Sequence, residues 1–179
     1  MPKTCSIVLI GFMGTGKSAI GRALAQRTDA LLVDTDTEIE RQAGHSVAKI
    51  FAQDGEAAFR ALETDTLRLL LAQKGEMIVA TGGGTPLRRE NAALLQSLGA
   101  VVWLTASPSV ILSRVGRVLA SRPLLANYLD DPLSRIETLV AERSPAYQAL
   151  AEWEFDTGAC GGPEEAADQI LSLLFQKNM

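Results

Sequence analysis

The chain has 179 residues, the usual size of one domain and enough to bury a sizeable hydrophobic core. Hydrophobic residues make up 47% and charged residues 21% of it, a composition typical of soluble globular proteins. The net charge of -4 argues against a nucleic-acid partner, because no excess of basic residues would offset repulsion by phosphates. We therefore expect small-molecule partners.

Nothing in the sequence indicates an exported or membrane protein. The first six residues, M-P-K-T-C-S, contain one Lys and no apolar signal-peptide core, and no apolar run reaches the roughly 18 residues of a membrane span. A cytoplasmic location is the default expectation. Cys5 and Cys160 are too few for a disulfide framework, and we interpret them as reduced thiols without function.

Apolar, β-rich runs alternate with helical patterns along the chain. Strands are predicted at residues 6–10, 30–33, 77–80, 100–104 and 154–156, and helices begin near Gly16, Asp36, Val47, Arg89, Pro108, Pro132 and Pro163. This order predicts an α/β fold, with a five-stranded parallel sheet and helices on both faces. No repeat or linker divides the chain, so a single domain over residues 1–179 is expected.

A phosphate-binding motif follows the first predicted strand. Residues 11–18 read G-F-M-G-T-G-K-S, and G-x-x-x-x-G-K-S between a strand and a helix is a P-loop, whose backbone N–H groups surround phosphate oxygens. Lys17 is placed to reach the β- and γ-phosphates of a nucleotide, and the Ser18 hydroxyl to ligate Mg²⁺. The alternative is a tight turn before an amphipathic helix, which would not account for the Lys-Ser pair.

Two carboxylates, Asp34 and Asp36, follow the second predicted strand in the sequence D-T-D. Ligands of open α/β sheets bind at the carboxyl ends of the strands. One carboxylate there could lie near Mg²⁺ and its waters, and the other near an acceptor hydroxyl. The alternative is that Asp36 or Thr35 caps the helix that follows.

The stretch from Gly44 to Glu63 predicts helical structure. Its apolar positions can pack a small helical subdomain: Val47, Ile50, Phe51, Phe59 and Leu62. Arg60 lies three residues before Glu63, and taken alone this pair indicates a surface salt bridge. We assign no catalytic role to the sole histidine, His45, because phosphoryl transfer does not require one.

Three glycines, Gly82, Gly83 and Gly84, follow the third predicted strand in the sequence T-G-G-G-T-P. They expose backbone N–H groups without side chains in the way, which suits close approach by a ligand. A flexible turn is the alternative. In a sheet of this kind, however, the turn should lie close to the P-loop.

Together these motifs resemble the shikimate kinase family. Six of them occur in the family's order and close to its spacing: G-F-M-G-T-G-K-S, D-T-D, G-E-A-A-F-R-A-L-E, T-G-G-G, R-P-L-L at residues 122–125 and R-S-P-A-Y-Q-A-L-A at residues 143–151. The resemblance covers nearly the whole chain. It implies a P-loop kinase fold of the nucleoside-monophosphate-kinase type, with a substrate-binding segment at about residues 34–63 and a lid at about residues 112–126.

The family's reaction transfers the γ-phosphoryl group of ATP to the 3-hydroxyl of shikimate, on the route to chorismate and the aromatic amino acids. The resemblance implies Lys17, Asp36 and Arg122 as catalytic residues, with Asp36 either accepting the hydroxyl proton or orienting the hydroxyl. Mg²⁺ would be held by Ser18 and, through water, by Asp34. The implied ATP-binding residues are Gly14, Thr15, Gly16, Lys17, Ser18, Ala19 and Arg122. The implied shikimate-binding residues are Asp36, Arg60, Gly82, Gly83, Gly84 and Arg143.

The lid departs from the family's pattern. Residues 112–125 read L-S-R-V-G-R-V-L-A-S-R-P-L-L, which is less polar than the family's usual sequence there. Arg114 or Arg117 could stack on adenine, or both could form a basic cluster that faces solvent. Residues 157–163 would lie by the adenine, without an assigned contact.

Two other functions stay open. Another small-molecule kinase, such as a gluconate kinase, would share the P-loop and sheet but would not need all six motifs. A non-catalytic binding protein would be expected to have lost Lys17, Asp36 or one of the motif arginines, and all are present. A monomer is expected, in keeping with the family and with the absence of an obvious apolar surface run.

Overall fold

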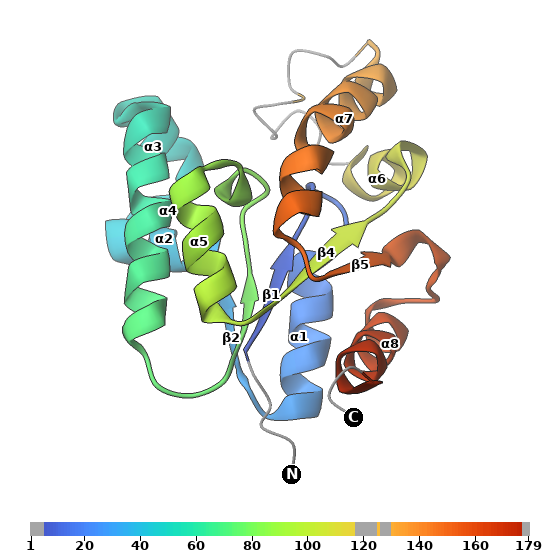
Figure 1. Cartoon of the computed structure of the whole chain (residues 1–179). Coiled ribbons are helices and arrows are strands. Elements are labelled where there is room, and N and C mark those ends of the chain that lie inside the picture. Colours follow the sequence, from blue (N-terminus) through green and yellow to red (C-terminus); the bar gives the residue numbers. More distant parts are fainter. Residues whose placement is uncertain (1–5, 117–124, 126–129, 177–179) are drawn as a thin grey trace.

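The computed structural model describes residues 6–116, 125 and 130–176, and a single parallel sheet forms its centre (Figure 1). The strands are β1 (Ile7–Ile10), β2 (Leu31–Asp34), β3 (Met77–Ala80), β4 (Ala100–Thr105) and β5 (Trp153–Asp156). They lie in the order β2-β3-β1-β4-β5, and every neighbouring pair is parallel. The predicted five-stranded sheet is confirmed, although several strand ends differ by one residue and β2 ends at Asp34.

Helices alternate with the strands. The α-helices are α1 (Lys17–Thr28), α2 (Thr35–Ala43), α3 (Val47–Gln53), α4 (Gly55–Ala72), α5 (Arg89–Leu98), α6 (Pro108–Val115), α7 (Pro132–Leu150) and α8 (Pro163–Gln176). The described residues also form the 3-10 helices η1 (Thr85–Leu87) and η3 (Thr157–Ala159). The predicted helix starts are within one residue of these, but α4 was not predicted as a separate helix. It is separated from α3 at Gly55, whose φ of 82° interrupts the helical path.

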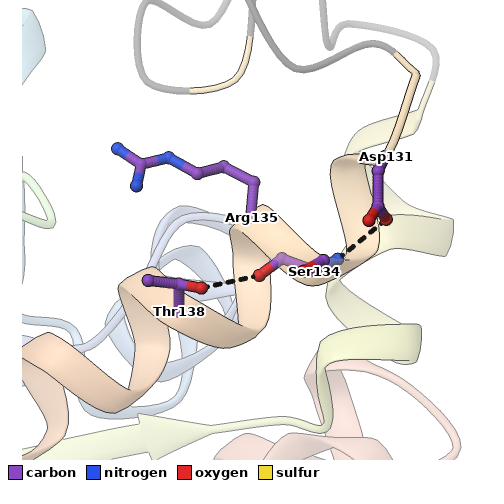
Figure 2. A pocket seen from close by; sticks show the side chains of 4 residues that line it. All are labelled: Asp131, Ser134, Arg135 and Thr138. Atoms are coloured by element: carbon purple, nitrogen blue, oxygen red, sulfur yellow. Dashed lines mark hydrogen bonds between the residues drawn. The ribbon is translucent and has the colours of Figure 1, made fainter.

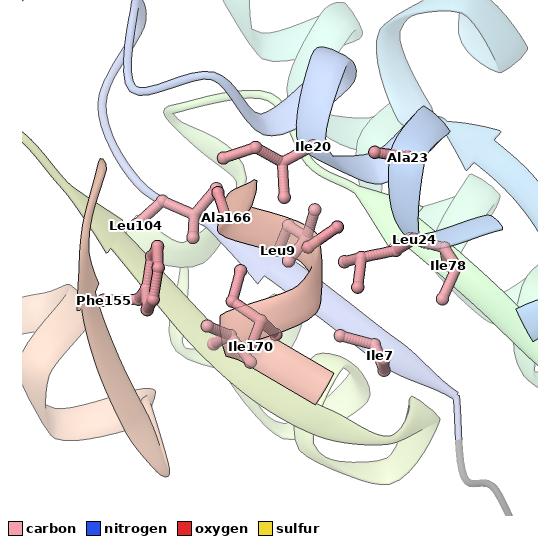
Figure 3. Close-up of a cluster of buried hydrophobic side chains, with 12 residues drawn as sticks. Ile7, Leu9, Ile20, Ala23, Leu24, Ile78, Leu104, Phe155, Ala166 and Ile170 are labelled. Carbon is pink, nitrogen blue, oxygen red and sulfur yellow. The ribbon is translucent and has the colours of Figure 1, made fainter. Parts of the chain in front are cut away.

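The sheet buries side chains on both faces. Along β1, Ile7 and Leu9 face α1 and α8, in the cluster drawn in Figure 3. Val8 and Ile10 face the opposite side, where they pack with residues of α4, α5 and α7. Because alternate residues of a strand point to opposite faces, a strand covered on both sides must be apolar at every position.

A third group of helices forms the predicted subdomain beside β2. Ile39 of α2, Ile50 of α3 and Phe59 of α4 form a buried cluster, and Val47, Phe51 and Leu62 pack against it. All five apolar positions expected to pack this subdomain therefore do so. The cluster positions the first turns of α4, which include Arg60.

The parallel arrangement brings all strand carboxyl ends to one edge of the sheet (Figure 1). The P-loop follows β1, the D-T-D sequence spans the end of β2, and the three glycines follow β3. Since β3 lies between β1 and β2, the glycines lie between the other two motifs. None of the helices in the described part of the chain is both long and apolar enough to span a bilayer.

Two leucines of α4 test the assignment of its buried face. Leu67 is 0% exposed and Leu69 is 53% exposed. We expect Leu67→Ala to lower the free energy of unfolding by about 3 to 5 kcal/mol, because it leaves a cavity in the core. The matched change Leu69→Ala should cost about 0.5 kcal/mol or less. Urea denaturation followed by circular dichroism measures both, and equal losses would contradict the assignment.

Candidate active site

The P-loop joins β1 to α1, and its first residue approaches the neighbouring strand closely. A Cβ atom on Gly11 would lie 2.3 Å from the Leu104 carbonyl oxygen of β4, so no other residue fits there. Gly16 precedes α1 with a φ of 97° and has no side chain to cap the helix. The first N–H groups of α1 are therefore available to an anion, as in other phosphate-binding helix termini.

Lys17 lies over this loop. Its Nζ donates hydrogen bonds to the carbonyl oxygens of Gly11 and Phe12, each at 2.8 Å. The ammonium group is also close enough to the Asp36 carboxylate to lower the pKa of that carboxyl, against stronger effects that raise it. The Lys17 ammonium group thus contacts the phosphate-binding loop and influences the Asp36 carboxylate in the first turn of α2.

Ser18 and Asp34 meet beside the P-loop. The Ser18 Oγ donates to the Asp34 Oδ2 at 2.6 Å. The other oxygen of Asp34 accepts from the backbone N–H groups of Asp36 and Thr37, so Asp34 is the cap of α2. The alternative that Asp36 or Thr35 caps this helix is wrong, because the strand continues to Asp34 and the helix begins one residue later.

This pair fits a magnesium ion. Mg²⁺ prefers oxygen ligands and is usually held by one or two carboxylates together with phosphates and waters. A hydroxyl and a carboxylate at the P-loop supply such a donor set. The described residues contain no cluster of three or more His, Cys, Asp or Glu that could form an all-protein cage.

Asp36 is the most perturbed acid of the site. Its Oδ1 is buried and has no hydrogen-bond partner within the described residues. Burial, followed by the charges of Asp34 and Glu63, raises the pKa of Asp36 from 3.8 to about 6. A carboxylate that is buried with an unused acceptor atom is suited to receive a hydrogen bond from a ligand hydroxyl.

Arg60 lies against the glycine turn. Its guanidinium pairs with Glu56 at 3.1 Å and with Glu63 at 2.7 Å. The expected salt bridge with Glu63 is present, but the interpretation that it lies on the surface is wrong, since the Glu63 side chain is 0% exposed. A Cβ atom on Gly84 would lie 2.5 Å from Arg60 Nη1, so a larger residue there would displace the guanidinium.

Arg143 reaches the same turn from α7. Its guanidinium carbon lies 5.5 Å from the centre of the Phe12 ring, and Nη1 would lie 3.7 Å from a Cβ atom on Gly83. The hydroxyl of Tyr147, one helical turn later, donates to the Gly83 carbonyl oxygen at 2.6 Å. The spacing of Tyr147 from Arg143 predicts that this tyrosine holds the helix of Arg143 in place, and the bond to Gly83 agrees with that role, although the partner itself was not predicted.

The glycine turn is anchored to both neighbouring motifs. The Gly82 N–H donates to the Thr35 hydroxyl at 3.0 Å, and the Thr81 N–H donates to the Leu9 carbonyl of β1 at 3.1 Å. A Cβ atom on Gly82 would lie 2.7 Å from Asp36 Oδ1. The structure thus brings Asp36, Arg60, Arg143 and the glycines together, whereas a flexible turn would leave them apart.

Arg114 links the P-loop to the end of the sheet. Its guanidinium donates to the Gly14 carbonyl at 3.2 Å, and to the Thr157 hydroxyl and carbonyl at 2.8 and 2.9 Å. It is therefore not a cation directed only at solvent. Arg117, Arg122 and most of the expected lid at 112–126 lie outside the described residues.

A separate hollow lies at the first turns of α7 (Figure 2). It is lined by Asp131, Ser134, Arg135 and Thr138, none of which was predicted for the site. Asp131 caps the helix by accepting from the Ser134 N–H at 3.2 Å, and the Thr138 hydroxyl donates to the Ser134 carbonyl at 2.9 Å. Asp131 and Thr138 therefore both form hydrogen bonds within α7 itself.

A P-loop before a helix without a side-chain cap lies next to a hydroxyl–carboxylate pair and to a group of one buried carboxylate and two arginines, and this arrangement places the protein among the P-loop phosphotransferases. Residues 13–175 match the family model for shikimate kinase. The chain belongs to the shikimate kinase family.

Individual relatives agree with the family assignment. The chain is 43% identical over 173 residues to the shikimate kinase of Pelotomaculum thermopropionicum, with 97% of each chain covered. It is 48% identical over 153 residues to that of Desulforudis audaxviator, covering 86% of this chain and 78% of the relative. The structure of Acinetobacter baumannii shikimate kinase in complex with shikimate has a TM-score of 0.90 and 33% identity, over 99% of this chain and 96% of that one. The P-loop kinase fold is therefore confirmed.

The raised pKa of Asp36 predicts how stability depends on pH. Between 3.8 and about 6 the folded protein holds a proton that the unfolded chain has released, so the free energy of unfolding should fall as pH rises. Asp36→Asn removes this loss of stability, because Asn does not ionise. At neutral pH, without nucleotide or metal, we expect the free energy of unfolding of the variant to exceed that of the unmodified protein by about 1 to 3 kcal/mol.

Urea denaturation at a series of pH values measures this difference. The control is Asp54→Asn, because Asp54 is exposed and its side chain makes no capping bond to α4. The control should follow the unmodified protein at every pH. If Asp36→Asn also followed it, burial of Asp36 would not destabilise the folded state.

Proposed function

We propose that this protein is an ATP-dependent shikimate kinase, which transfers the γ-phosphoryl group of ATP to the 3-hydroxyl of shikimate. The proposal depends above all on one observation. Guanidinium groups from two helices, Arg60 of α4 and Arg143 of α7, converge on the glycine turn beside the P-loop. Such groups bind a carboxylate through paired, charge-assisted hydrogen bonds, and shikimate is a hydroxylated carboxylate.

The acceptor site would hold shikimate by its two kinds of polar group. Arg60 and Arg143 would bind the carboxylate, while Asp36 and the Gly82–Gly84 turn would contact the ring hydroxyls. The unused Oδ1 of Asp36 supports this role, since a buried acceptor without a partner is costly until a donor arrives. A ligand hydroxyl would supply that donor.

The donor site would hold ATP on the P-loop, through Gly14, Thr15, Gly16, Lys17, Ser18 and Ala19. Lys17 would exchange its bonds to the Gly11 and Phe12 carbonyls for bonds to the transferring phosphates. Ser18 and Asp34 would hold Mg²⁺, which neutralises phosphate charge during transfer. Arg122 of the expected lid would add a further positive charge over ATP.

Rate enhancement would come from alignment and charge. The transition state of phosphoryl transfer is loose, so the protein must align the hydroxyl with the γ-phosphorus and neutralise the oxygens. Asp36 would orient the attacking hydroxyl and accept its proton. Burial raises the pKa of Asp36 to about 6, which makes this carboxylate a stronger base than an exposed one yet leaves it mostly ionised at neutral pH.

We also propose that the chain forms a single domain, acts as a monomer and is cytoplasmic. The substrate-binding segment would comprise about residues 34–63 and the lid about residues 112–126. Light scattering after gel filtration would test the monomer.

The reaction itself is tested by ADP release with ATP and Mg²⁺, comparing shikimate, gluconate and no acceptor. We expect release that depends on shikimate, because the chain belongs to the shikimate kinase family and carries all six of its motifs; gluconate, which has the same chemical groups on an open chain, tests whether the site requires the ring. Release with gluconate alone would indicate the alternative kinase, which the family assignment does not favour. No release with either acceptor would indicate a binding protein.

Replacing Arg60 tests its contact with the carboxylate. We expect Arg60→Lys to raise KM for shikimate by about 10- to 100-fold and to change KM for ATP by less than about twofold, because Lys cannot form paired hydrogen bonds. The matched control is Arg68→Lys in the same helix, where Arg68 pairs with Asp65 and Glu90 at the surface. Steady-state kinetics measures KM for shikimate and for ATP in both variants. If Arg60→Lys raised the two KM values equally, the assignment of Arg60 to the carboxylate would be wrong.

A further inference from the structure

Beside the glycine turn, a series of hydrogen bonds leads from the Arg60 guanidinium back to α4 at Thr64, and together with α4 it forms a ring. Arg60 Nη1 donates to Glu63 Oε2 at 2.7 Å, and Thr85 Oγ1 donates to Glu63 Oε1 at 2.5 Å. Asn91 Nδ2 donates to the Thr85 carbonyl at 3.1 Å. Thr64 Oγ1 donates its single proton to Asn91 Oδ1 at 2.7 Å, in preference to the Arg60 carbonyl oxygen at 3.2 Å, and the turn of α4 between Arg60 and Thr64 closes the ring.

Most of this ring is hidden from solvent. Thr85 and Asn91 are 0% exposed, Glu63 is 1% exposed and Thr64 is 4% exposed. The Arg60 side chain, 23% exposed, is the most exposed member and lies against Gly84. A buried polar group that loses its partner costs free energy, so each residue of the ring holds the next in position. The last group held in this way is the Arg60 guanidinium.

The Arg60 guanidinium has little room to move. Its Nη1 and Nη2 would lie 2.5 and 2.7 Å from a Cβ atom on Gly84, so the arginine lies directly against the turn that precedes Thr85. Asn91 holds the backbone of Thr85, the residue directly after this turn, and Glu63 holds both the Thr85 side chain and the Arg60 guanidinium. If the guanidinium or the turn moved, the hydrogen-bond donors available to a carboxylate ligand would be misplaced.

We propose that Asn91 and Thr64 are positioning residues for the acceptor carboxylate. They would act through the ring, which fixes the Arg60 guanidinium relative to the glycine turn. Neither is exposed enough to contact a substrate, so their effect must pass through other residues. This inference rests on the proposed shikimate kinase activity.

The backbone of Arg60 has a second restraint from the surface. Arg88 Nη1 donates to the Arg60 carbonyl at 2.8 Å and lies 3.4 Å from Thr64 Oγ1. The Arg60 backbone therefore keeps a partner when the Thr64 hydroxyl is removed. What is lost is the link from Thr64 to Asn91, and with it the restraint on the turn.

The same change, Thr to Val, at two positions of α4 tests the proposal. Thr64→Val removes the ring hydroxyl with little change of shape, and Thr66→Val removes a buried hydroxyl that has no hydrogen-bond partner among the described residues. We expect Thr64→Val to raise KM for shikimate by about three- to tenfold, with kcat and KM for ATP changed by less than about twofold. Thr66→Val should leave all three unchanged, and Thr64→Ser should restore KM because it keeps the hydroxyl.

A substrate analogue separates positioning from a general loss of structure. Binding of shikimate and of its carboxamide should be measured by calorimetry with both Thr64→Val and Asn91→Leu. We expect weaker binding of shikimate but unchanged binding of the carboxamide, because the ring acts through the contact between Arg60 and the carboxylate. Equal losses for both ligands would overturn the proposal.

The outcomes for this inference and for the activity are distinct. If the unmodified protein releases ADP with shikimate, while Thr64→Val and Asn91→Leu bind shikimate as the unmodified protein does, the positioning role is wrong and the activity stands. If the unmodified protein shows no shikimate-dependent ADP release, the proposed function is wrong, and the positioning role that rests on it is wrong too.

Discussion

The parallel hydrogen bonding of β1 with β3 is the constraint on which the site depends. In this register the Thr81 N–H donates to the Leu9 carbonyl, so the turn after β3 starts level with the last residues of β1. The P-loop and the glycine turn therefore lie side by side at one edge of the sheet. Because the two turns are neighbours, a phosphate bound on one can lie close to a hydroxyl bound on the other, which phosphoryl transfer requires.

Charge is concentrated at this edge at a cost in stability. Burial raises the pKa of Asp36 most, and the nearby carboxylates of Asp34 and Glu63 raise it further. Lys17 offsets only part of this effect. Such an arrangement is unfavourable in the empty protein, but it provides an acceptor for a ligand hydroxyl and a site for a cation.

The arginines are supported in different ways. Arg60 is held by two carboxylates and by the ring of buried polar groups behind Glu63. Arg143 lies over the Phe12 ring, and its helix is tied to the glycine turn by the Tyr147 hydroxyl. Both supports end on the same turn, so the positions of the two guanidinium groups are linked through its backbone.

Much of the fold and the identity of the candidate residues could be predicted from the sequence. The strands are short apolar runs covered on both faces, and the P-loop, D-T-D and T-G-G-G motifs each follow one of them, so local pattern was sufficient. The local sequence pattern did not predict helix boundaries that depend on a single residue. The break at Gly55 and the capping of α2 are examples, since Asp36 or Thr35 was expected to cap the helix and Asp34 does so.

Contacts between distant segments were decided only by the tertiary structure. The spacing of Arg60 and Glu63 indicated a surface pair, but whether Glu63 is buried depends on η1 and α5, which pack over α4. Likewise, no local signal joins Thr64 to Asn91 or Tyr147 to Gly83, because hydrogen bonds between buried side chains form only where packing brings their elements together. The sequence by itself determined which chemical groups the site contains, and the packing of helices against the sheet decided how those groups are held.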